Sequence, residues 1–383
     1  MTELKPIKVA TIVGTRPELI RLSRVIALLD GHVDHILVHT GQNYDYELNE
    51  IFFKDLGIRE PNHFLEVEVS SLGRVLGETI SKSEVVLRKE NPDAVLILGD
   101  TNSSLAGIMA KRLKIPVYHM EAGNRCFDLN VPEEINRKII DHISDFNLVY
   151  TENARRHLLS EGLPHRRIYL TGSPMYEVLT HYEKQIKQSK ILGELALDKK
   201  GYFVVSIHRE ENVDNSENLK NILGILNSIC RHWEMPVIVS THPRTADRLK
   251  KLEGSETDGR IRFLKPFGFF DYVHLQTMSK CTISDSGTIS EESSILSFPA
   301  ITLRRSMERP EAIDSGTIIL TGFDRETVLS SIELVIGEHE GGSYRHIPDE
   351  YRVENTSMLV LKIIVGTARL SNYWHGILPK VGE

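Results

Sequence analysis

Short apolar runs alternate along the chain with longer stretches in which apolar residues recur every three or four positions. In the first half the apolar runs are at 7–13, 94–98 and 117–120, and the amphipathic stretches that follow them are at 17–29, 103–113 and 132–144. The runs have the β-branched composition of buried strands, and the longer stretches have the period of helices that cover a sheet. This alternation predicts an α/β fold with a parallel sheet.

The same pattern returns in the second half, after a Gly-Ser-Pro segment at 172–174. We predict a lysine-rich helix at about 176–200 and then strands at 202–207, 237–240, 261–264, 282–284 and 300–303. The chain should therefore form two doubly wound, Rossmann-like domains. The first covers residues 1–172 with a last helical segment at about 355–383, and the second covers 173–354.

Length and charge limit the classes of function. A chain of 383 residues can build two domains with separate cores. The net charge of −7 argues against broad binding of nucleic acid, which requires a large basic surface. No apolar run approaches the ~18 residues of a membrane span, and the first residues do not resemble a secretion signal, so we expect a cytoplasmic protein. Cys126, Cys230 and Cys281 form no CxxC pair, and we expect structural thiols.

An anion-holding arrangement is predicted at the end of the first strand, where open α/β sheets bind ligands. The segment GTRPE combines a glycine turn, a proline suited to the first helical position and Arg16 beside the helix start. It matches neither GxxxxGK[ST] nor GxGxxG, so neither ATP nor a nicotinamide cofactor is indicated. A helix cap with a surface arginine is the alternative interpretation.

Carboxylates follow the next two predicted strands and open the next helix. GDTN places Asp100 and Asn102 at one strand end, and HMEAGNR places Glu121 at the other. PEEINR begins a helix with Glu133 and Arg137 in its first turns. Carboxylates are rarely buried without a partner or a task, so we expect acid/base groups here. The alternatives are a helix cap by Asp100 and an ordinary i,i+4 pair on the helix.

Two predicted strands of the second domain end beside histidines. HREEN contains His208, and THPR contains His242. Each histidine is next to an arginine, which favours a phosphate or acid/base site over a metal site, since neither HExxH nor a compact His/Cys cluster is present. The segment KPFGFFDY contains Phe270, which could stack on a flat base or serve the core.

The strongest phosphate signal is SDSGTISEE, in which a predicted strand turns into a helix. The backbone amides and hydroxyls of Ser286, Gly287 and Thr288 can hold a diphosphate at the helix start. Glu292 lies one turn along and could accept bonds from ribose hydroxyls, and Arg309 in ERPE supplies a further cation. A helix capped by Ser286 is the ordinary alternative.

Carboxylates in one domain and a nucleotide cradle in the other predict a sugar-nucleotide enzyme of the glycosyltransferase-B type, with its active site in the cleft between the domains. The segments GTRPE, GDTNS, HMEAGNR, PEEINR, HREEN, THPR, SDSGTISEES and ERPE occur in this order over essentially the whole chain. Together they resemble the non-hydrolysing UDP-N-acetylglucosamine 2-epimerase family.

Longer sequence segments distinguish the branches of that family. TGQNYD, EAGNRCFDLNVPEEINRK and KPFGFFDY are most similar to the branch that makes UDP-N-acetyl-L-fucosamine from UDP-2-acetamido-2,6-dideoxy-L-talose, for capsule or O-antigen synthesis. Members that act on N-acetylglucosamine usually have lysine where this chain has Arg21. They also tend to carry a Gln-His segment, linked to activation by a second substrate molecule, where this chain reads GQNYD.

The resemblance implies C2 epimerisation without a cofactor or metal, by elimination of UDP to a glycal and its re-addition. It implies proton transfer by Asp100, Glu121 and Glu133, with His208 as acid or electrostatic partner, and a dimeric enzyme. The implied substrate contacts are Arg16, Arg21, Asn102, Arg137, His242, Phe270, Ser286, Gly287, Thr288, Glu292 and Arg309. The open alternatives are a UDP-N-acetylglucosamine/UDP-N-acetylmannosamine 2-epimerase, a hydrolysing epimerase, a glycosyltransferase and a non-catalytic UDP-sugar-binding protein.

Overall fold

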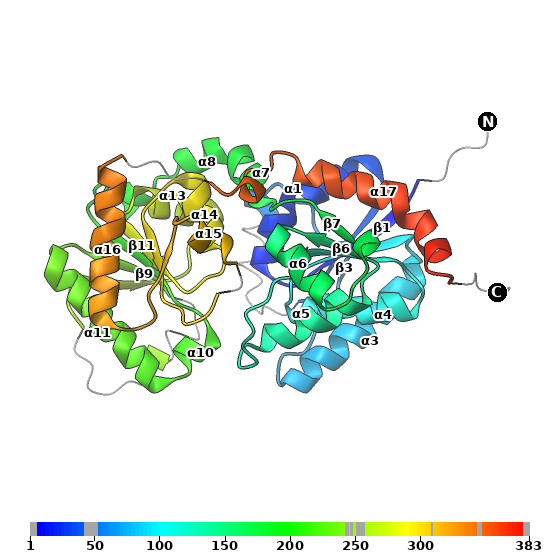
Figure 1. Cartoon of the computed structure of the whole chain (residues 1–383), viewed down its shortest axis with the longest axis horizontal. Helices are drawn as coiled ribbons and strands as arrows, with labels where there is room; N and C mark the ends of the chain where they lie inside the picture. Colours follow the sequence, from blue (N-terminus) through cyan, green and yellow to red (C-terminus); the bar gives the residue numbers. More distant parts are fainter. Residues whose placement is uncertain are drawn as a thin grey trace. The chain divides into compact units, whose positions relative to one another are not determined.

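The computed structural model describes residues 6–41, 53–241, 245, 248–249, 257–307, 309–342 and 347–377. The chain divides into two compact units. Unit 1 comprises Met1–Val178 and Arg352–Glu383, and unit 2 comprises Leu179–Tyr351. Each unit is a parallel sheet with helices packed over its faces (Figure 1), which confirms the predicted fold class. Among the described residues, no helix combines the length and the apolar character needed to cross a membrane.

Unit 1 has a seven-stranded sheet in the order β3-β2-β1-β4-β5-β6-β7. The strands are β1 (Lys8–Val13), β2 (Asp34–His39), β3 (His63–Phe64), β4 (Ala94–Leu98), β5 (Val117–Ala122), β6 (Phe146–Val149) and β7 (Ile168–Leu170). β4 is buried along its whole length, as expected for a strand covered on both faces. The strand order reverses between β1 and β4, and such a switch point is where α/β sheets bind ligands.

The helices of unit 1 include one from the far end of the chain. They are α1 (Arg16–His32), α3 (Leu72–Glu90), α4 (Ala106–Arg112), α5 (Pro132–Ile143), α6 (Glu152–Ser160) and α17 (Thr356–Trp374), with 3₁₀ turns η1 (Asn102–Leu105) and η2 (His165–Arg167). α17 packs against α1 (Figure 1). It buries Val360, Leu361 and Ile364, and Thr367 Oγ lies 2.7 Å from the hydroxyl of Tyr118 in β5.

Unit 2 has a six-stranded sheet in the order β10-β9-β8-β11-β12-β13, with its switch point between β8 and β11. The strands are β8 (Phe203–Ser206), β9 (Val237–Ser240), β10 (Ile261–Leu264), β11 (Cys281–Ser284), β12 (Ala300–Thr302) and β13 (Ile319–Leu320). The helices are α8 (Glu183–Lys187), α9 (Ile191–Glu194), α10 (Glu210–Val213), α11 (Ser216–Trp233), α13 (Phe269–Met278), α14 (Ile289–Leu296), α15 (Glu311–Asp314) and α16 (Arg325–Glu340), with the 3₁₀ turn η3 (Asp349–Tyr351).

The single lysine-rich helix predicted at 176–200 is wrong. The segment forms three short helices, α7 (Met175–His181), α8 and α9. Tyr182 leaves the helical conformation and buries its ring 5.4 Å from that of Phe270. Ser189 donates its hydroxyl to Asp271 and accepts a bond from the N–H of Ile191, which starts a new helix. Local side-chain bonds of this kind compete with a continuous helix.

Candidate active site

Glu121 in β5 has a strained backbone. Its φ is +66°, in the left-handed region that favours glycine, and a non-glycine residue there costs ~1–3 kcal/mol. The pairing of β5 with β6 shifts its register between Met120 and Ala122, so Glu121 is the extra residue of a bulge. Bulges re-aim side chains, and strain of this kind gathers at functional sites.

The carboxylate of Glu121 lies beside a buried cation and the end of β4. Its Oε2 is 3.6 Å from Nη1 of Arg21. Arg21 is 2% exposed, and its guanidinium lies 5.8 Å from the ring centre of Tyr150. A Cβ placed on Gly99 would stand 3.9 Å from Glu121 Oε2. The turn that carries Asp100 and the bulge that carries Glu121 are therefore neighbours at one edge of the sheet.

Asp100 is held in place by the start of α5. Arg137 donates to Asp100 Oδ2 from Nε at 2.9 Å and also from Nη2, while its Nη1 donates to Glu134 at 2.6 Å. Asn136 donates its amide to the carbonyl oxygen of Asp100 at 3.0 Å and to Asn102 Oδ1 at 3.1 Å. The contacts of Arg137 with these two carboxylates give it a positioning role toward Asp100, in addition to the substrate contact expected from the sequence.

Adjacent glutamates of α5 lie in different environments. Successive helical residues point about 100° apart, and here Glu133 is exposed while Glu134 is fully buried. Glu134 pairs with Arg137 and accepts a bond from the N–H of Cys126 at 3.2 Å. The sequence pointed to Glu133 but not to Glu134, whose role is to pair with Arg137 in the interior. The three-residue spacing of Glu134 and Arg137 on the buried face was the available signal.

A second buried ion-pair network supports the turn that follows Glu121. Asp141 accepts a bond from Arg125 at 2.7 Å, lies 2.9 Å from Nδ1 of His119 and accepts the N–H of Gly123 at 3.2 Å. Arg125 also donates to Glu161 at 2.7 Å through two nitrogens. Buried charges are tolerated when they are paired in this way. Asp141 and Glu161 were missed because they lie far along the chain from the turn that they support.

Glu18 joins two strand ends, and sequence reasoning assigned it no role. Its carboxylate accepts the N–H of Gly14 at 2.7 Å and the hydroxyl of Thr15 at 3.0 Å, both in the turn before α1. It also accepts the hydroxyl of Ser103 at 3.0–3.1 Å and that of Thr101, in the turn after β4. Burial raises the pKa of Glu18 from 4.5 to about 7. The spacing Thr15-x-x-Glu18 is a capping-box pattern that could have drawn attention to it.

The predicted cation Arg16 and the predicted acid/base residue His208 each lie just beyond a strand. Arg16 is the first residue of α1 and is half-buried. The His208 side chain is 47% exposed, and its Nδ1 lies 3.3 Å from Asp285 Oδ1. Asp285, which the sequence did not single out, is fully buried and accepts the N–H groups of His208 and Arg209 at 3.0–3.2 Å. It also accepts the amide of Asn212 at 2.9 Å.

The predicted phosphate turn follows β11 in unit 2. Ser286 Oγ accepts the N–H of Thr288 at 3.3 Å, and α14 begins one residue later. Arg309 is buried and forms an ion pair with Glu291, and its Nη1 lies 3.4 Å from the carbonyl oxygen of Gly287. The turn thus combines two hydroxyls, a helix start and a nearby cation, which suits an anionic ligand.

The remaining predicted contacts in unit 2 are Glu292, Phe270 and His242. Glu292 faces α13 and accepts the amide of Gln276 at 2.8 Å, and it is 7% exposed. Phe270 is half-buried as the second residue of α13. His242 lies outside the described residues, as does most of the GQNYD segment.

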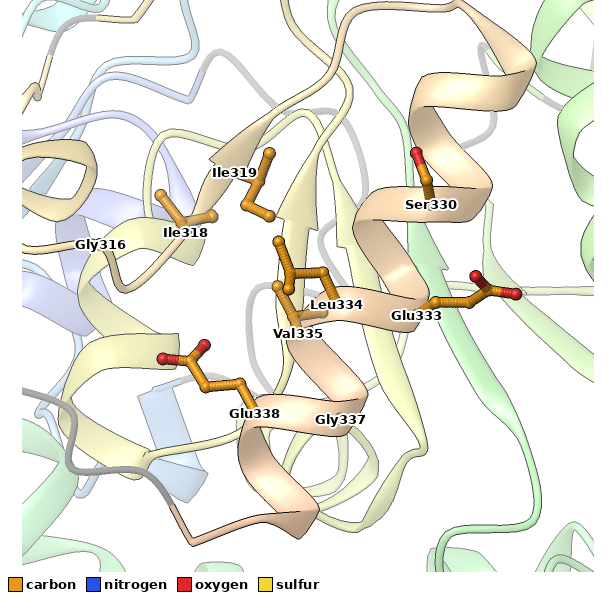
Figure 2. Close-up of a pocket in the computed structure, with 9 residues that line it drawn as sticks. All are labelled: Gly316, Ile318, Ile319, Ser330, Glu333, Leu334, Val335, Gly337 and Glu338. Atoms are coloured by element: carbon orange, nitrogen blue, oxygen red, sulfur yellow. The ribbon is translucent and has the colours of Figure 1, made fainter.

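A groove elsewhere on unit 2 lacks these features. It has a volume of about 880 Å³ and lies between the β13 segment and α16. Figure 2 shows apolar side chains, including Ile318, Leu334 and Val335, gathered in it, with Glu333 pointing away. Glu333 pairs with His232 at 2.8 Å. None of the predicted site residues lines this groove, so we place no catalytic chemistry there.

Two parallel-sheet units of the glycosyltransferase-B type, with carboxylates at the strand ends of one and a phosphate-type turn in the other, define a sugar-nucleotide enzyme. Residues 28–365 match the model of a family described as UDP-N-acetylglucosamine 2-epimerase. The chain belongs to this family and is a UDP-sugar epimerase.

Similar proteins cover almost the whole chain. The structure of a UDP-N-acetylglucosamine 2-epimerase from Rickettsia bellii is 49% identical, with a TM-score of 0.90, over 97% of this chain and 100% of that one. The Methanocaldococcus jannaschii enzyme in complex with UDP-GlcNAc and UDP is 34% identical, with a TM-score of 0.87, over 94% and 100%. A UDP-2,3-diacetamido-2,3-dideoxy-D-glucuronate 2-epimerase from Pseudomonas aeruginosa is 32% identical over 86% of this chain and 93% of its own.

Proposed function

We propose that this protein converts UDP-2-acetamido-2,6-dideoxy-L-talose to UDP-N-acetyl-L-fucosamine by inversion at C2, in the synthesis of capsule or O-antigen precursors. The observation that carries the C2 chemistry is the strained Glu121, beside Arg21 and next to the turn that holds Asp100. Arg21, in place of the usual lysine, and the three branch-specific segments support the choice of sugar. The Pseudomonas aeruginosa relative, named for a different UDP-sugar, supports the view that family membership leaves the sugar open.

In the proposed reaction a base removes the proton from C2, the C–H electron pair forms the C1=C2 bond, and UDP leaves with the electrons of the C1–O bond. A proton then adds to C2 from the opposite face, and UDP returns to C1. Asp100, Glu121 and Glu133 transfer the protons, because this chemistry needs acid/base groups on both faces of the ring. Arg137 acts by holding Asp100. Exclusion of water protects the glycal from side reactions.

The departing diphosphate requires stabilisation by cations and oriented N–H groups. We assign His208 to this role, with Asp285 as its support. The other proposed diphosphate contacts are Arg16, His242, Ser286, Gly287, Thr288 and Arg309. Glu292 is proposed to bind the ribose and Phe270 the base, with Asn102 near the sugar.

We further propose that the enzyme acts in the cytoplasm as a homodimer. Large apolar side chains are exposed on two helices of unit 1, including Val85 on α3 and Ile135 and Ile139 on α5. A contact with a second copy of the chain would remove these side chains from water. Sedimentation at micromolar concentration tests the dimer. A species at the mass of one chain at all concentrations would contradict it.

The experiment that tests the reaction is an NMR time course in deuterated water with UDP-2-acetamido-2,6-dideoxy-L-talose and UDP-N-acetylglucosamine offered separately. We expect turnover of the L-talo sugar and deuterium at C2 of the product. Turnover of UDP-N-acetylglucosamine alone would favour the second candidate function, which the names of the Rickettsia bellii and Methanocaldococcus jannaschii enzymes support. Product without deuterium at C2 would rule out the elimination scheme, and free sugar as product would indicate a hydrolysing epimerase.

A further inference from the structure

We propose that Glu18 is a positioning residue whose ionised carboxylate couples the turn carrying Arg16 to the turn carrying Asp100. This inference rests on the proposed roles of Arg16 and Asp100 in substrate binding and proton transfer. Glu18 itself is 1% exposed, and each of its side-chain contacts is to one of these two turns. It is therefore assigned no direct contact with the substrate.

The two turns lie on either side of the switch point of the unit 1 sheet. One follows β1 and the other follows β4, and these strands are paired neighbours. The register of β1 with β4 ends at Thr11 and Leu96, before either turn begins, and the carboxylate of Glu18 links the two turns beyond that point through side-chain bonds. Glu18 supplies such bonds at one end of the Asp100 turn, through Thr101 and Ser103. Arg137 holds the Asp100 side chain from α5.

The protonation state of Glu18 determines the strength of this link. An ionised carboxylate only accepts hydrogen bonds, so the N–H of Gly14 and the hydroxyls of Thr15 and Thr101 can donate to it together, while the single hydroxyl proton of Ser103 goes either to Glu18 or to Thr101. A protonated carboxyl must donate one bond, which forces one hydroxyl to reorient, and it loses the strength of a charge-assisted bond. The hydroxyl oxygens of Thr101 and Ser103 are 2.7 Å apart, so reorientation of one hydroxyl changes the hydrogen bonding of the other.

The groups that contact Glu18 are uncharged, so burial is the main influence on its ionisation. The charged residues of the two turns have other positions: Arg16 begins α1, and Asp100 is paired with Arg137. Arg21, one turn along α1, lies beside Glu121. Burial raises the pKa of Glu18 to about 7, and the bonds from Thr101, Gly14, Ser103 and Thr15 oppose that rise. Both protonation states are therefore populated near neutral pH.

An ordinary capping role would make Glu18 simply stabilising, and stability and activity would then fall together on substitution. In its buried position the ionised carboxylate instead lowers the stability of the folded protein. Its pKa in the folded protein is above the value of 4.5 in the unfolded chain, so the stability that it contributes is greatest below pH 4.5 and is lost as the pH rises through about 7. At pH 8 the buried charge opposes folding while it organises the turns.

The test is Glu18→Gln, which keeps the shape of the side chain and imitates the protonated state. We expect kcat at pH 8 to fall about tenfold, the energy of roughly one charge-assisted hydrogen bond, with KM little changed. Below pH 6 the variant and the wild type should converge. The melting temperature at pH 8 should equal or exceed that of the wild type. Wild-type kcat at pH 8, or a loss of kcat matched by a fall in melting temperature, would overturn the proposal.

A second variant changes Thr101, in the turn that carries Asp100. Thr101→Val removes one bond that lowers the pKa of Glu18, so the limb of the kcat profile near pH 7 should move to higher pH. For Glu18→Gln the matched control is Glu60→Gln, which makes the same charge change on an exposed side chain. An unmoved limb in Thr101→Val would argue against the coupling. Asp100→Asn separates the two proposals: if it is fully active, the site assignment fails, whereas if it is inactive and Glu18→Gln is normal, only the role of Glu18 fails.

Discussion

The two units build their functional turns by different means. In unit 1, side-chain carboxylates at the ends of β4 and β5 are held by buried arginines and by a strained backbone at Glu121. In unit 2, the turn after β11 relies on backbone groups and hydroxyls, with Asp285 binding the N–H groups of the turn after β8. Both kinds of turn therefore depend on partners distant in the chain, but in unit 1 those partners hold the carboxylate side chains proposed to transfer protons, whereas in unit 2 they hold backbone N–H groups.

The largest effect should follow from changing one of the residues that we propose to transfer protons in unit 1. Glu121→Gln keeps the size of the side chain but removes the basic carboxylate, and we expect kcat to fall about 10³-fold, within the usual range for a general base. The melting temperature should fall modestly, because the buried Arg21 loses the charge that faces it. Exchange of the C2 hydrogen with deuterium measures the same step directly. Retention of more than a tenth of wild-type exchange would show that Glu121 is not the essential base, and Glu60→Gln is the control.

An intermediate effect is expected from the support of Asp100. Arg137→Met leaves the buried Glu134 without its strongest partner, and breaking a buried ion pair costs about 3–5 kcal/mol of stability. We expect kcat to fall about 100-fold as Asp100 loses its anchor. The double variant with Glu134→Gln should recover part of the melting temperature but not kcat. If kcat recovered together with stability, Arg137 would be a structural residue only.

The smallest effect should come from unit 2. Asp285→Asn removes the charge that faces His208 but keeps an oxygen that can accept a backbone N–H. We expect kcat to fall about tenfold, roughly one charge-assisted hydrogen bond, with a changed pH profile for kcat. Asp314→Asn, on an exposed residue of the same unit, is the control. If kcat of Asp285→Asn fell further than kcat of Arg137→Met, the comparison between the two units would be reversed.

Much of the fold could be predicted from the sequence because buried parallel strands have an unmistakable apolar composition. The runs at 94–98 and 237–240 correspond closely to β4 and β9. The segment at 176–200 was misjudged because its helical composition did not reveal that Tyr182 and Ser189 form bonds and contacts that interrupt a helix. Tertiary packing determined the secondary structure of that segment.

The sequence indicated strand-end residues, but it did not reveal what supports them. Glu18, Asp141 and Asp285 are buried acids that bond to residues on other segments of the chain, whereas Glu134 pairs within its own helix. Glu18 contacts residues about 85 positions away, and Asp285 contacts residues about 77 positions away. A single sequence contains no record of these long-range pairings, although it does show the local spacings of Thr15 with Glu18 and of Glu134 with Arg137. The bulge at Glu121 was equally hidden, because glutamate carries no preference for a left-handed backbone.

The return of the chain to unit 1 in α17 has a consequence for the order of folding during synthesis. Unit 2 is a continuous segment, whereas unit 1 lacks the helix that covers α1 until Thr356–Trp374 has been made. The ribosome therefore releases all of unit 2 before unit 1 can close. Until then the side of α1 that packs against α17 is uncovered, and α1 is the helix that carries Arg16, Glu18 and Arg21. The unit that we propose to perform proton transfer is thus the last to be completed, and it exposes this part of α1 while the chain emerges.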